Sequence, residues 1–434
     1  MDKMADVLGR AGAWCGQNKY LSAIKNAFQN FMPLTIAGAI GVLWCNVLVN
    51  DQTGLGLFFK PIMALDFLNP AFQAVNFCTI SCITVGITLG IAQEIGIWNM
   101  GAEKAGYIPG LVGLAAWLSV TNTSHMVEGA KDAFTGISGN ELGATGLFTG
   151  MIIGILSVEL FCFFEKQDAL KIKMPEQVPP GVARAFEVLV PATITLIITA
   201  CIGSACYNLT GLYLNDVIKN GIQGPLGAVG ATIPGVMIIY LVIMLFWLVG
   251  IHGNNMLSAV KEALFTPLAL ENVEKFNKGE KPTNIINMYA LQMWGEFGGS
   301  GVTIGLVIAI MIFGKREDNK AIATLSLVPG LFNINETVTF GIPMVLNPIL
   351  GIPFVVAPLI TIIIGYVLTV IGFCPVACLT VPWTTPPIVF GFLACGANVM
   401  GAVTQAILIV VSTVIYTPFL ISYEKYQNKQ AAEA

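Results

Sequence analysis

The sequence predicts an all-α polytopic membrane protein with about ten transmembrane helices, and three observations support this fold class. Apolar residues make up 55% of the 434 residues and charged residues only 11%. The mean hydropathy is +0.77. A soluble domain carries about 25% charged residues, so this chain has too few charges to cover soluble domains of its length. Long uncharged runs also match a helix of about 20 residues that crosses ~30 Å of hydrocarbon.

Charged residues mark the boundaries of the predicted spans. Five intervals contain no charge, residues 26–50, 67–93, 105–127, 188–215 and 220–260. A sixth span covers residues 142–164, with Glu159 near its end. The run from Thr337 to Tyr423 is also uncharged, and its prolines and glycines divide it into crossings near 348–371 and 401–423. Residues 254–314 are predicted to form two imperfect crossings on either side of a polar tip, residues 274–283, which brings the total to ten.

Basic residues predict the orientation. Twenty lysines and arginines lie outside the predicted spans, fourteen on the side that holds the termini and six on the other. The positive-inside rule then places both termini in the cytoplasm. A basic and amphipathic stretch, residues 165–184, is predicted as a cytoplasmic interface connector that ends at Pro179-Pro180-Gly181. It separates two halves of five spans each, residues 1–185 and 186–434.

Glu336 is the first polar residue that stands out within apolar sequence. It lies between Pro329 and Pro343, which leave too little chain for a crossing, and close to Asn333 and Asn335. An ionisable residue at membrane depth is costly and therefore a functional candidate. Irregular backbone survives there only when it is buried in protein or lines an aqueous cavity. We interpret this stretch as a binding segment; a surface loop between helices is the alternative.

His252 is the second candidate, at the end of a strongly apolar segment. Trp247 precedes it by five residues, and Asn254 follows closely. Aromatic rings beside imidazole, carboxylate and amide groups suit a sugar, because the ring covers the C–H face while the polar groups bond the hydroxyls. The alternative is a histidine that only completes a helix terminus.

Two further patches accompany these candidates. Gly298-Gly299-Ser300-Gly301 follows Glu296 at a break between apolar segments, as either a helix-packing site or an irregular wall of a cavity. Trp383 is the only aromatic residue in the proline-broken stretch 381–387. We interpret it as a second sugar-stacking ring; a tryptophan of the interfacial belt is the alternative.

Taken together, these motifs resemble the membrane component (IIC) of the lactose/cellobiose/diacetylchitobiose family of bacterial phosphotransferase systems. The resemblance covers residues 20–425 and rests on the following motifs in family order: Lys173-Met174-Pro175, Gly250-Ile251-His252-Gly253, Gly298-Gly299-Ser300-Gly301, Asn333-Ile334-Asn335-Glu336, Gly341-Ile342-Pro343, Asn347-Pro348 and Pro382-Trp383-Thr384. It implies a homodimeric permease of the bacterial inner membrane with ten spans and two re-entrant hairpins. The N-terminal half would form the dimer scaffold and the C-terminal half would carry the sugar.

The resemblance also implies roles for single residues. Glu336 and His252 would bind the sugar near the hydroxyl to be phosphorylated, and Trp247 and Trp383 would flank it. We expect the sugar-binding set to include these further residues: Asn254, Gly298, Gly299, Ser300, Asn333 and Asn335. Thr337-Val338-Thr339 departs from the proline and aliphatic residue of some relatives. The identity of the sugar therefore stays open.

The expected partners follow from this interpretation. The substrate is a β-linked disaccharide, and a separate IIB subunit with a phosphocysteine phosphorylates it at the cytoplasmic face, so that the chain itself needs no independent catalytic activity. Only eleven residues follow Tyr423, which is the reason to expect IIB as a separate chain. The lipid bilayer is the other partner; we expect no metal, no cofactor and no nucleic acid. A proton-coupled sugar symporter with Glu336 as proton carrier is the alternative, and a membrane-embedded enzyme or channel has less support.

Overall fold

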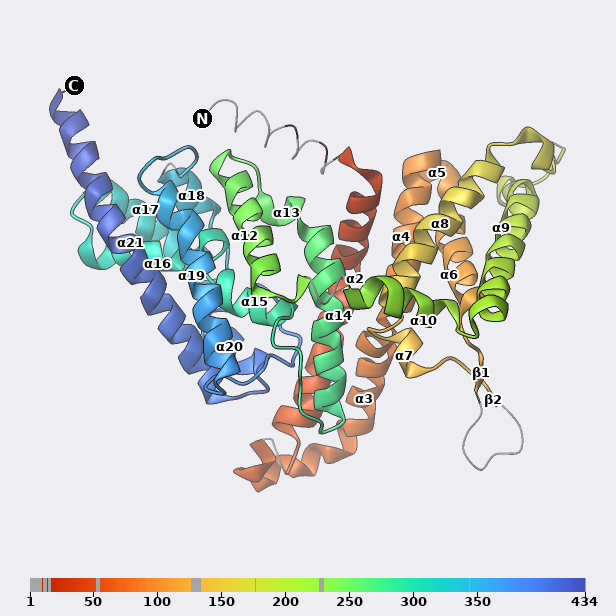
Figure 1. Cartoon of the computed structure of the whole chain (residues 1–434), viewed down its shortest axis with the longest axis horizontal. Coiled ribbons are helices and arrows are strands. Elements are labelled where there is room, and N and C mark those ends of the chain that lie inside the picture. Colours follow the sequence, from red (N-terminus) through yellow and green to blue (C-terminus); the bar gives the residue numbers. More distant parts are fainter. Residues whose placement is uncertain are drawn as a thin grey trace. The chain divides into compact units, whose positions relative to one another are not determined.

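The computed structural model describes Arg10, Trp14 and residues 17–51, 55–125, 134–175, 177–225, 230–342 and 344–433. Pro343 of the predicted binding segment therefore lies outside the described residues. Helices form nearly all of the regular structure, which confirms the all-α prediction (Figure 1). Within the described residues the only strands are β1 (Ser124–His125) and β2 (Phe134–Thr135), a two-residue antiparallel pair.

The chain divides into two compact units. Unit 2 comprises residues 17–38 and 74–228, and unit 1 comprises residues 1–16, 39–73 and 229–434. Unit 2 holds the first part of α2 (Lys19–Leu43) and the helices α4 (Ile83–Met100), α5 (Ala102–Ala105), α6 (Ile108–Val120), α7 (Gly139–Leu142), α8 (Leu147–Glu165), α9 (Pro180–Thr210) and α10 (Leu214–Ile218). The predicted halves, 1–185 and 186–434, and the roles assigned to them stay predictions.

The core of unit 2 is built from α4, α6 and α8, which pack on one another, with α9 against α6 and α8. Glycines allow this close packing: a side chain at Gly113 would lie 2.3 Å from Cβ of Ala92. Small residues at such contacts are typical of helix pairs in membranes. The helix α9 begins at Pro180, a residue that suits the first helical position, which confirms the predicted end of the connector.

A buried charge cluster closes one end of unit 2. Glu165, the last residue of α8, is buried and pairs with Lys104 at 2.8 Å and with Arg184 at 3.0 Å. Arg184 also pairs with Glu187 at 2.7 Å. Opposite charges thus tie the end of α8 to α5 and to the start of α9, across the connector.

Unit 1 carries the remaining helices. Those after residue 229 are α12 (Ile233–Leu248), α13 (Gly253–Met256), α14 (Ser258–Asn277), α15 (Met288–Gly295), α16 (Ile304–Phe313), α17 (Glu317–Leu331), α18 (Glu336–Gly341), α19 (Gly351–Val370), α20 (Val389–Ala394) and α21 (Val399–Glu433); α3 (Asn69–Cys78) begins in this unit as well. The helix α19 packs against α12, α15 and α21, and α21 also packs against α16 and α20. This places α19 and α21 at the centre of the unit.

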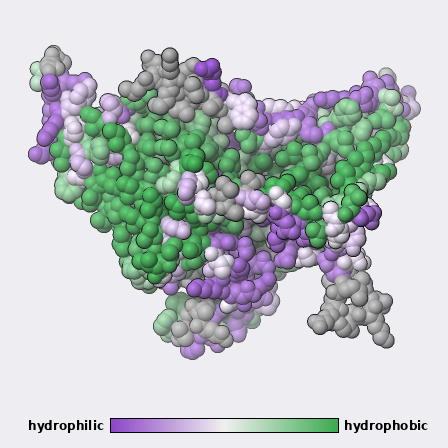
Figure 2. Space-filling view, in the orientation of Figure 1, coloured by the Kyte–Doolittle hydropathy of each residue, from purple (hydrophilic) through white to green (hydrophobic). Residues whose placement is uncertain are grey.

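The helix α21 shows that the surroundings are lipid. Between residues 403 and 421 several apolar side chains point outward, whereas several polar ones are buried. Val403, Val410, Val414 and Ile421 are exposed, and Thr404, Gln405 and Ser412 are buried. A soluble amphipathic helix buries its apolar side chains and exposes its polar ones. The opposite distribution seen here suits an apolar solvent. Figure 2 shows mostly apolar side chains over the visible face of unit 1, with polar ones gathered towards its ends.

Among the described residues, six helices are long and apolar enough to cross a membrane. The pair Met288–Val302 and Ile304–Phe313, bent by 60°, is a seventh candidate. The helices α6 and α12 are apolar but shorter. A polytopic membrane fold is therefore confirmed, while the number ten and the two hairpins stay predictions. Of the two imperfect crossings predicted in 254–314, only this bent pair is among the candidate spans, and α14 is not. The predicted tip, 274–283, begins inside α14, which ends at Asn277.

Candidate functional site

Three breaks in the helices of unit 1 carry the candidate site. One lies between α12 and α13, one between α15 and α16, and one between α17 and α18. A backbone hydrogen bond from Leu346 N to Leu248 O, 2.8 Å long, ties the chain that follows α18 to the end of α12. His252 and Glu336 are thereby held in one region of the unit.

His252 precedes α13 and caps its N-terminus. Gly250 has a φ of +81°, which glycine adopts without strain and which lets the chain turn after α12. The Nδ1 atom of His252 accepts the N–H of Asn255 at 3.3 Å. In the neutral ring the proton therefore lies on Nε2, so this atom is a hydrogen-bond donor.

Glu336 begins α18, and its carboxylate faces that donor. The Nε2 atom of His252 lies 3.8 Å from Oε1 of Glu336, and the two side chains are 37% and 46% exposed. This distance exceeds a direct hydrogen bond, which for N–H···O measures about 2.7–3.2 Å. A hydroxyl oxygen to one side of the line that joins these two atoms, at about 2.8 Å from each, could accept from the imidazole and donate to the carboxylate.

Trp247 supports the histidine rather than presenting an open ring face. Its ring centroid lies 4.4 Å from that of His252, at an interplanar angle of 47°, and the side chain is 2% exposed. Phe354 of α19 packs edge-on against it at 6.4 Å. The orientation of the His252 ring is thus fixed by packing as well as by its cap. A direct contact of Trp247 with sugar stays a prediction.

The glycines of 298–301 are required by backbone conformation and by close packing. Gly298, Gly299 and Gly301 all have positive φ, and the 60° bend between Met288–Val302 and Ile304–Phe313 follows them directly. A Cβ on Gly299 would lie 2.7 Å from Cβ of Asn335, and one on Gly301 would lie 2.3 Å from the Phe354 ring. The segment is therefore irregular and packs directly on the break that carries Glu336.

Asn333 joins three segments through its side chain. Its Oδ1 atom accepts the N–H of Gly298 at 2.6 Å, and its Nδ2 atom donates to the carbonyls of Trp383 and Thr385. Asn333 itself has a φ of +62°, a region that asparagine tolerates better than most residues. These contacts support a positioning role, and direct sugar binding by Asn333 stays a prediction.

Asn335 is buried and also bonds to the protein. Its Nδ2 atom donates to the carbonyl of Ser300 at 2.8 Å and to the hydroxyl of Thr339 at 3.1 Å.

Trp383, by contrast, is 44% exposed, although its backbone is held by Asn333. Of the aromatic residues predicted for the site, Trp383 is the one whose ring is open to a ligand.

A buried ion pair lies behind Asn254 and Ser300. The amide of Asn254 donates to Oγ of Ser300 at 2.9 Å and accepts from Nζ of Lys261 at 3.4 Å. Lys261 pairs with Glu296, whose carboxylate also accepts the hydroxyl of Tyr240 at 2.6 Å. Lys261 and Glu296 were expected only as interruptions of the spans at 254–314. Two opposite charges within apolar sequence, Lys261 and Glu296, are the feature from which this ion pair could have been predicted.

Within the described residues no group of three or more histidines, cysteines or acidic residues is arranged to hold a metal ion. The polar groups of the site are hydrogen-bond donors and acceptors of the kind that bind hydroxyls.

Comparison with known proteins adds the family. Residues 25–358 match the family model described as "Phosphotransferase system, EIIC". The sequence is 33% identical to the oligo-beta-mannoside-specific EIIC component of Bacillus subtilis (strain 168), over 98% of this chain and 94% of that protein. It is 30% identical to the cellobiose-specific EIIC component of Lactococcus lactis subsp. lactis (strain IL1403), over 98% of both.

A solved structure matches the whole architecture. The crystal structure of the transporter ChbC, the IIC component from the N,N'-diacetylchitobiose-specific phosphotransferase system, superposes with a TM-score of 0.88. The two chains are 29% identical, and the match covers 97% of each.

Proposed function

The chain belongs to the EIIC family of phosphotransferase systems, whose members are membrane-embedded sugar permeases, and we propose that it imports a β-linked disaccharide by group translocation. The relatives with 30–33% identity have names that specify oligo-β-mannosides and cellobiose. The matching crystal structure is named for diacetylchitobiose. All three names describe β-linked sugars, which is the basis for the substrate class proposed here.

One observation carries the proposal. The Nε2 donor of His252 and the Oε1 acceptor of Glu336 face each other at 3.8 Å, and both side chains are accessible. Asn333 connects the segment of Glu336 to the backbone of Trp383, whose ring is open. A hydroxyl between His252 and Glu336 and a pyranose face on Trp383 would use all three groups as their chemistry requires.

The proposed reaction transfers a phosphoryl group from a phosphocysteine of a separate IIB subunit to that hydroxyl. The P–S bond breaks as the new P–O bond forms, and the electron pair of the P–S bond leaves with the cysteine as thiolate. Because His252 donates from Nε2, Glu336 is the group that takes the hydroxyl proton. The added charge then prevents the sugar from returning through the apolar membrane.

Uptake into sealed vesicles tests the proposal. Right-side-out vesicles that contain the protein are loaded with phosphoenolpyruvate and the soluble phosphotransferase components. Radiolabelled cellobiose, lactose and diacetylchitobiose are then offered in turn. We expect accumulation of the phosphorylated form of at least one sugar, unaffected by a protonophore. Accumulation of free sugar that a protonophore abolishes would instead support the proton-coupled symporter with Glu336 as carrier.

The assembly we propose is a homodimer through the N-terminal half, with both termini in the cytoplasm, where IIB approaches. The exposed apolar side chains of α9, such as Ile197 and Ile202, offer surface to lipid or to a second copy. Light scattering with a correction for bound detergent measures the number of chains. A monomer under conditions that preserve sugar binding would contradict the dimer.

A further inference from the structure

The segment that carries Trp383 has no regular structure, so something else must hold it. It runs from the end of α19 at Val370 to the start of α20 at Val389 and contains several prolines. Nevertheless Ala377, Leu379 and Val381 are buried. A chain without helical hydrogen bonds is ordered at membrane depth only when its polar backbone groups bond to other parts of the protein.

Two asparagines bond to this segment at one carbonyl. The Nδ2 atom of Asn272 donates to the carbonyl of Ala377 at 3.0 Å, and the Nδ2 atom of Asn287 donates to the same oxygen at 3.1 Å. Both amide groups also donate to the carbonyl of Asn284, each at 2.8 Å. Asn272 and Asn287 are 0% exposed. We call this arrangement the asparagine clamp.

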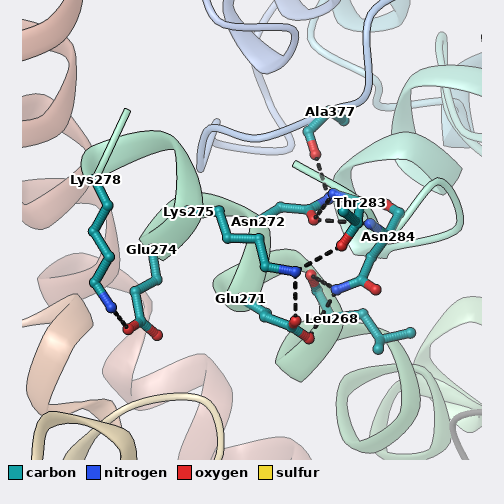
Figure 3. Close-up of polar contacts among 9 residues, drawn as sticks. All are labelled: Leu268, Glu271, Asn272, Glu274, Lys275, Lys278, Thr283, Asn284 and Ala377. Carbon is teal, nitrogen blue, oxygen red and sulfur yellow. Dashed lines mark hydrogen bonds and ion pairs between the residues drawn. The ribbon is translucent and has the colours of Figure 1, made fainter. Parts of the chain in front are cut away.

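The clamp also orders the tip between α14 and α15. The Oδ1 atom of Asn272 accepts the N–H groups of Thr283 and Asn284 at 3.2 and 3.0 Å (Figure 3). Asn287 caps α15, because its Oδ1 atom accepts the N–H groups of Tyr289 and Ala290. Both hydrogens of each amide, and the oxygen of each, are thus in use. Only a neutral amide provides two donors and an acceptor in this geometry.

The contact continues from Ala377 towards Trp383. The hydroxyl of Tyr289 donates to Thr380 Oγ1 at 2.9 Å, and both residues are buried. The backbone N–H groups of Cys378 and Leu379 donate to the carbonyl of Ala394 in α20. A packed stretch therefore leads from the clamp to Pro382, after which the exposed ring of Trp383 begins. Asn333 holds the backbone at residue 383, because its Nδ2 atom donates to the carbonyl of Trp383.

We propose that Asn272 and Asn287 are positioning residues of the sugar site, which act through the carbonyl of Ala377 to place the ring of Trp383. The inference rests on the proposed sugar function, because it assigns to Trp383 a contact with the substrate. Both asparagines are fully buried, so we expect neither to contact that substrate. Their contribution is a fixed backbone, so that the aromatic surface is in place before the sugar arrives.

Asn287→Ser is the main test variant. Serine is a favoured N-cap residue and retains an acceptor for α15, but it is too short to reach Ala377 and has no amide donors. Asn272→Ala is the second variant, and it removes the other amide that donates to the carbonyl of Ala377. Lys278→Ala is the matched control. Lys278 lies in the same tip, and its side chain forms an exposed pair with Glu274, at 2.6 Å, that does not involve Ala377 (Figure 3).

Sugar affinity is measured both with Trp383 present and in a Trp383→Ala background. The comparison separates an effect on the position of Trp383 from a general loss of folded structure. Binding is measured by calorimetry on the full chain in detergent, with whichever of cellobiose, lactose and diacetylchitobiose the unsubstituted protein binds. We expect Asn287→Ser and Asn272→Ala to weaken binding at least threefold when Trp383 is present, and by less than 1.5-fold in a Trp383→Ala background. Lys278→Ala should change nothing in either background. Equal losses in both backgrounds, or no loss in either, would overturn the inference.

A second measurement needs no sugar. With 5-fluorotryptophan incorporated, the ¹⁹F resonance of residue 383 is assigned by its loss in Trp383→Phe. We expect this resonance to shift or broaden in Asn287→Ser and to keep its position in Lys278→Ala. An unchanged resonance would contradict the clamp, even if Asn272→Ala fails to fold. A protein that binds none of the sugars yet shows the shift would contradict the proposed function and leave the clamp supported.

Discussion

Asn333 holds the backbone of Trp383: its Nδ2 atom donates to the carbonyl of Trp383, while its Oδ1 atom accepts the N–H of Gly298. One side chain thus links the break that carries Glu336 to the glycine segment and to the exposed tryptophan. The proposed sugar stacking at Trp383 would therefore depend on the same scaffold that places the carboxylate. This relationship supports the proposal that the aromatic and polar contacts belong to one site.

Trp383→Ala should weaken sugar binding. An aromatic contact contributes ~0.5–1.5 kcal/mol beyond the buried area, which corresponds to about 2- to 13-fold in the dissociation constant. Trp383→Phe keeps a ring and should lose less. Calorimetry with the purified protein measures both variants. An alanine variant that folds normally and binds with unchanged affinity would place Trp383 in a lipid-facing belt instead.

Breaking the buried pair between Lys261 and Glu296 should cost more stability than removing both charges. Lys261→Met leaves the Glu296 carboxylate buried with the Tyr240 hydroxyl as its remaining partner, which costs about 3–5 kcal/mol by comparison with other buried pairs. The double variant Lys261→Met/Glu296→Gln leaves no uncompensated charge and should recover most of that loss. Thermal unfolding in detergent measures the order of stability.

The exposed pair between Lys278 and Glu274 is the control for this comparison. Exposed pairs contribute about 0–1 kcal/mol, so Lys278→Ala should leave the midpoint nearly unchanged. A double variant at 261 and 296 that is no more stable than Lys261→Met would contradict a simple charge-pair explanation.

Gly299→Ala should destabilise the protein for two reasons: the new Cβ would contact Asn335, and alanine is strained at the positive φ of this position. The φ of Gly299 is +86°, and a Cβ there would lie 2.7 Å from Asn335. Gly101→Ala is the matched control, because its φ is +82° while a Cβ there meets nothing within 4 Å. Forced overpacking costs about 1–3 kcal/mol beyond the conformational strain that both variants share. Equal melting temperatures for the two variants would mean that Asn335 can move aside.

The orientation is tested with single cysteines in a cysteine-free chain. Lys171→Cys and Lys425→Cys should escape an impermeant thiol reagent in intact cells and react after permeabilisation, because both positions are predicted to be cytoplasmic. Lys278→Cys, in the tip predicted to lie outside, should react in intact cells. Labelling of positions 171 and 425 in intact cells would reverse the assignment.

The sequence predicted the fold class and the helical breaks for identifiable reasons. The low content of charged residues predicts a membrane fold, because a surface with few charges is stable in lipid and not in water. Pro180 marks the start of α9, because proline suits the first helical turn. The glycines at 298–301 were interpreted either as a helix-packing site or as an irregular wall of a cavity. Their positive φ values show irregular backbone, and Gly299 and Gly301 also pack closely on Asn335 and Phe354. Pro329 was expected to limit the binding segment, yet α17 continues through it to Leu331. A proline removes only one backbone donor, and this helix ends two residues later.

Side-chain partners were much harder to predict than backbone breaks. Asn333 and Asn335 were expected to face a ligand, whereas the hydrogen bonds found for them are directed at the protein. Amide groups serve both purposes, and a sequence does not distinguish them. The pairing of Lys261 with Glu296 and the shared bonds of Asn272 and Asn287 to Ala377 depend on tertiary contacts between distant segments. Local pattern carries no information about such contacts.

The most direct test of the account replaces Glu336. Glu336→Gln keeps the shape and the hydrogen-bonding capacity but no longer accepts a proton. Glu336→Ala removes the group that faces His252 altogether. Both are compared with the unsubstituted protein in equilibrium sugar binding and in phosphoenolpyruvate-driven uptake into vesicles.

The account predicts that Glu336→Ala abolishes sugar binding. For Glu336→Gln it predicts a fall in uptake of about 100-fold or more, the range expected for a lost general base, with a loss in binding of less than about tenfold. Near-normal uptake by Glu336→Ala would contradict the account, because the sugar hydroxyl would then not lie between His252 and Glu336.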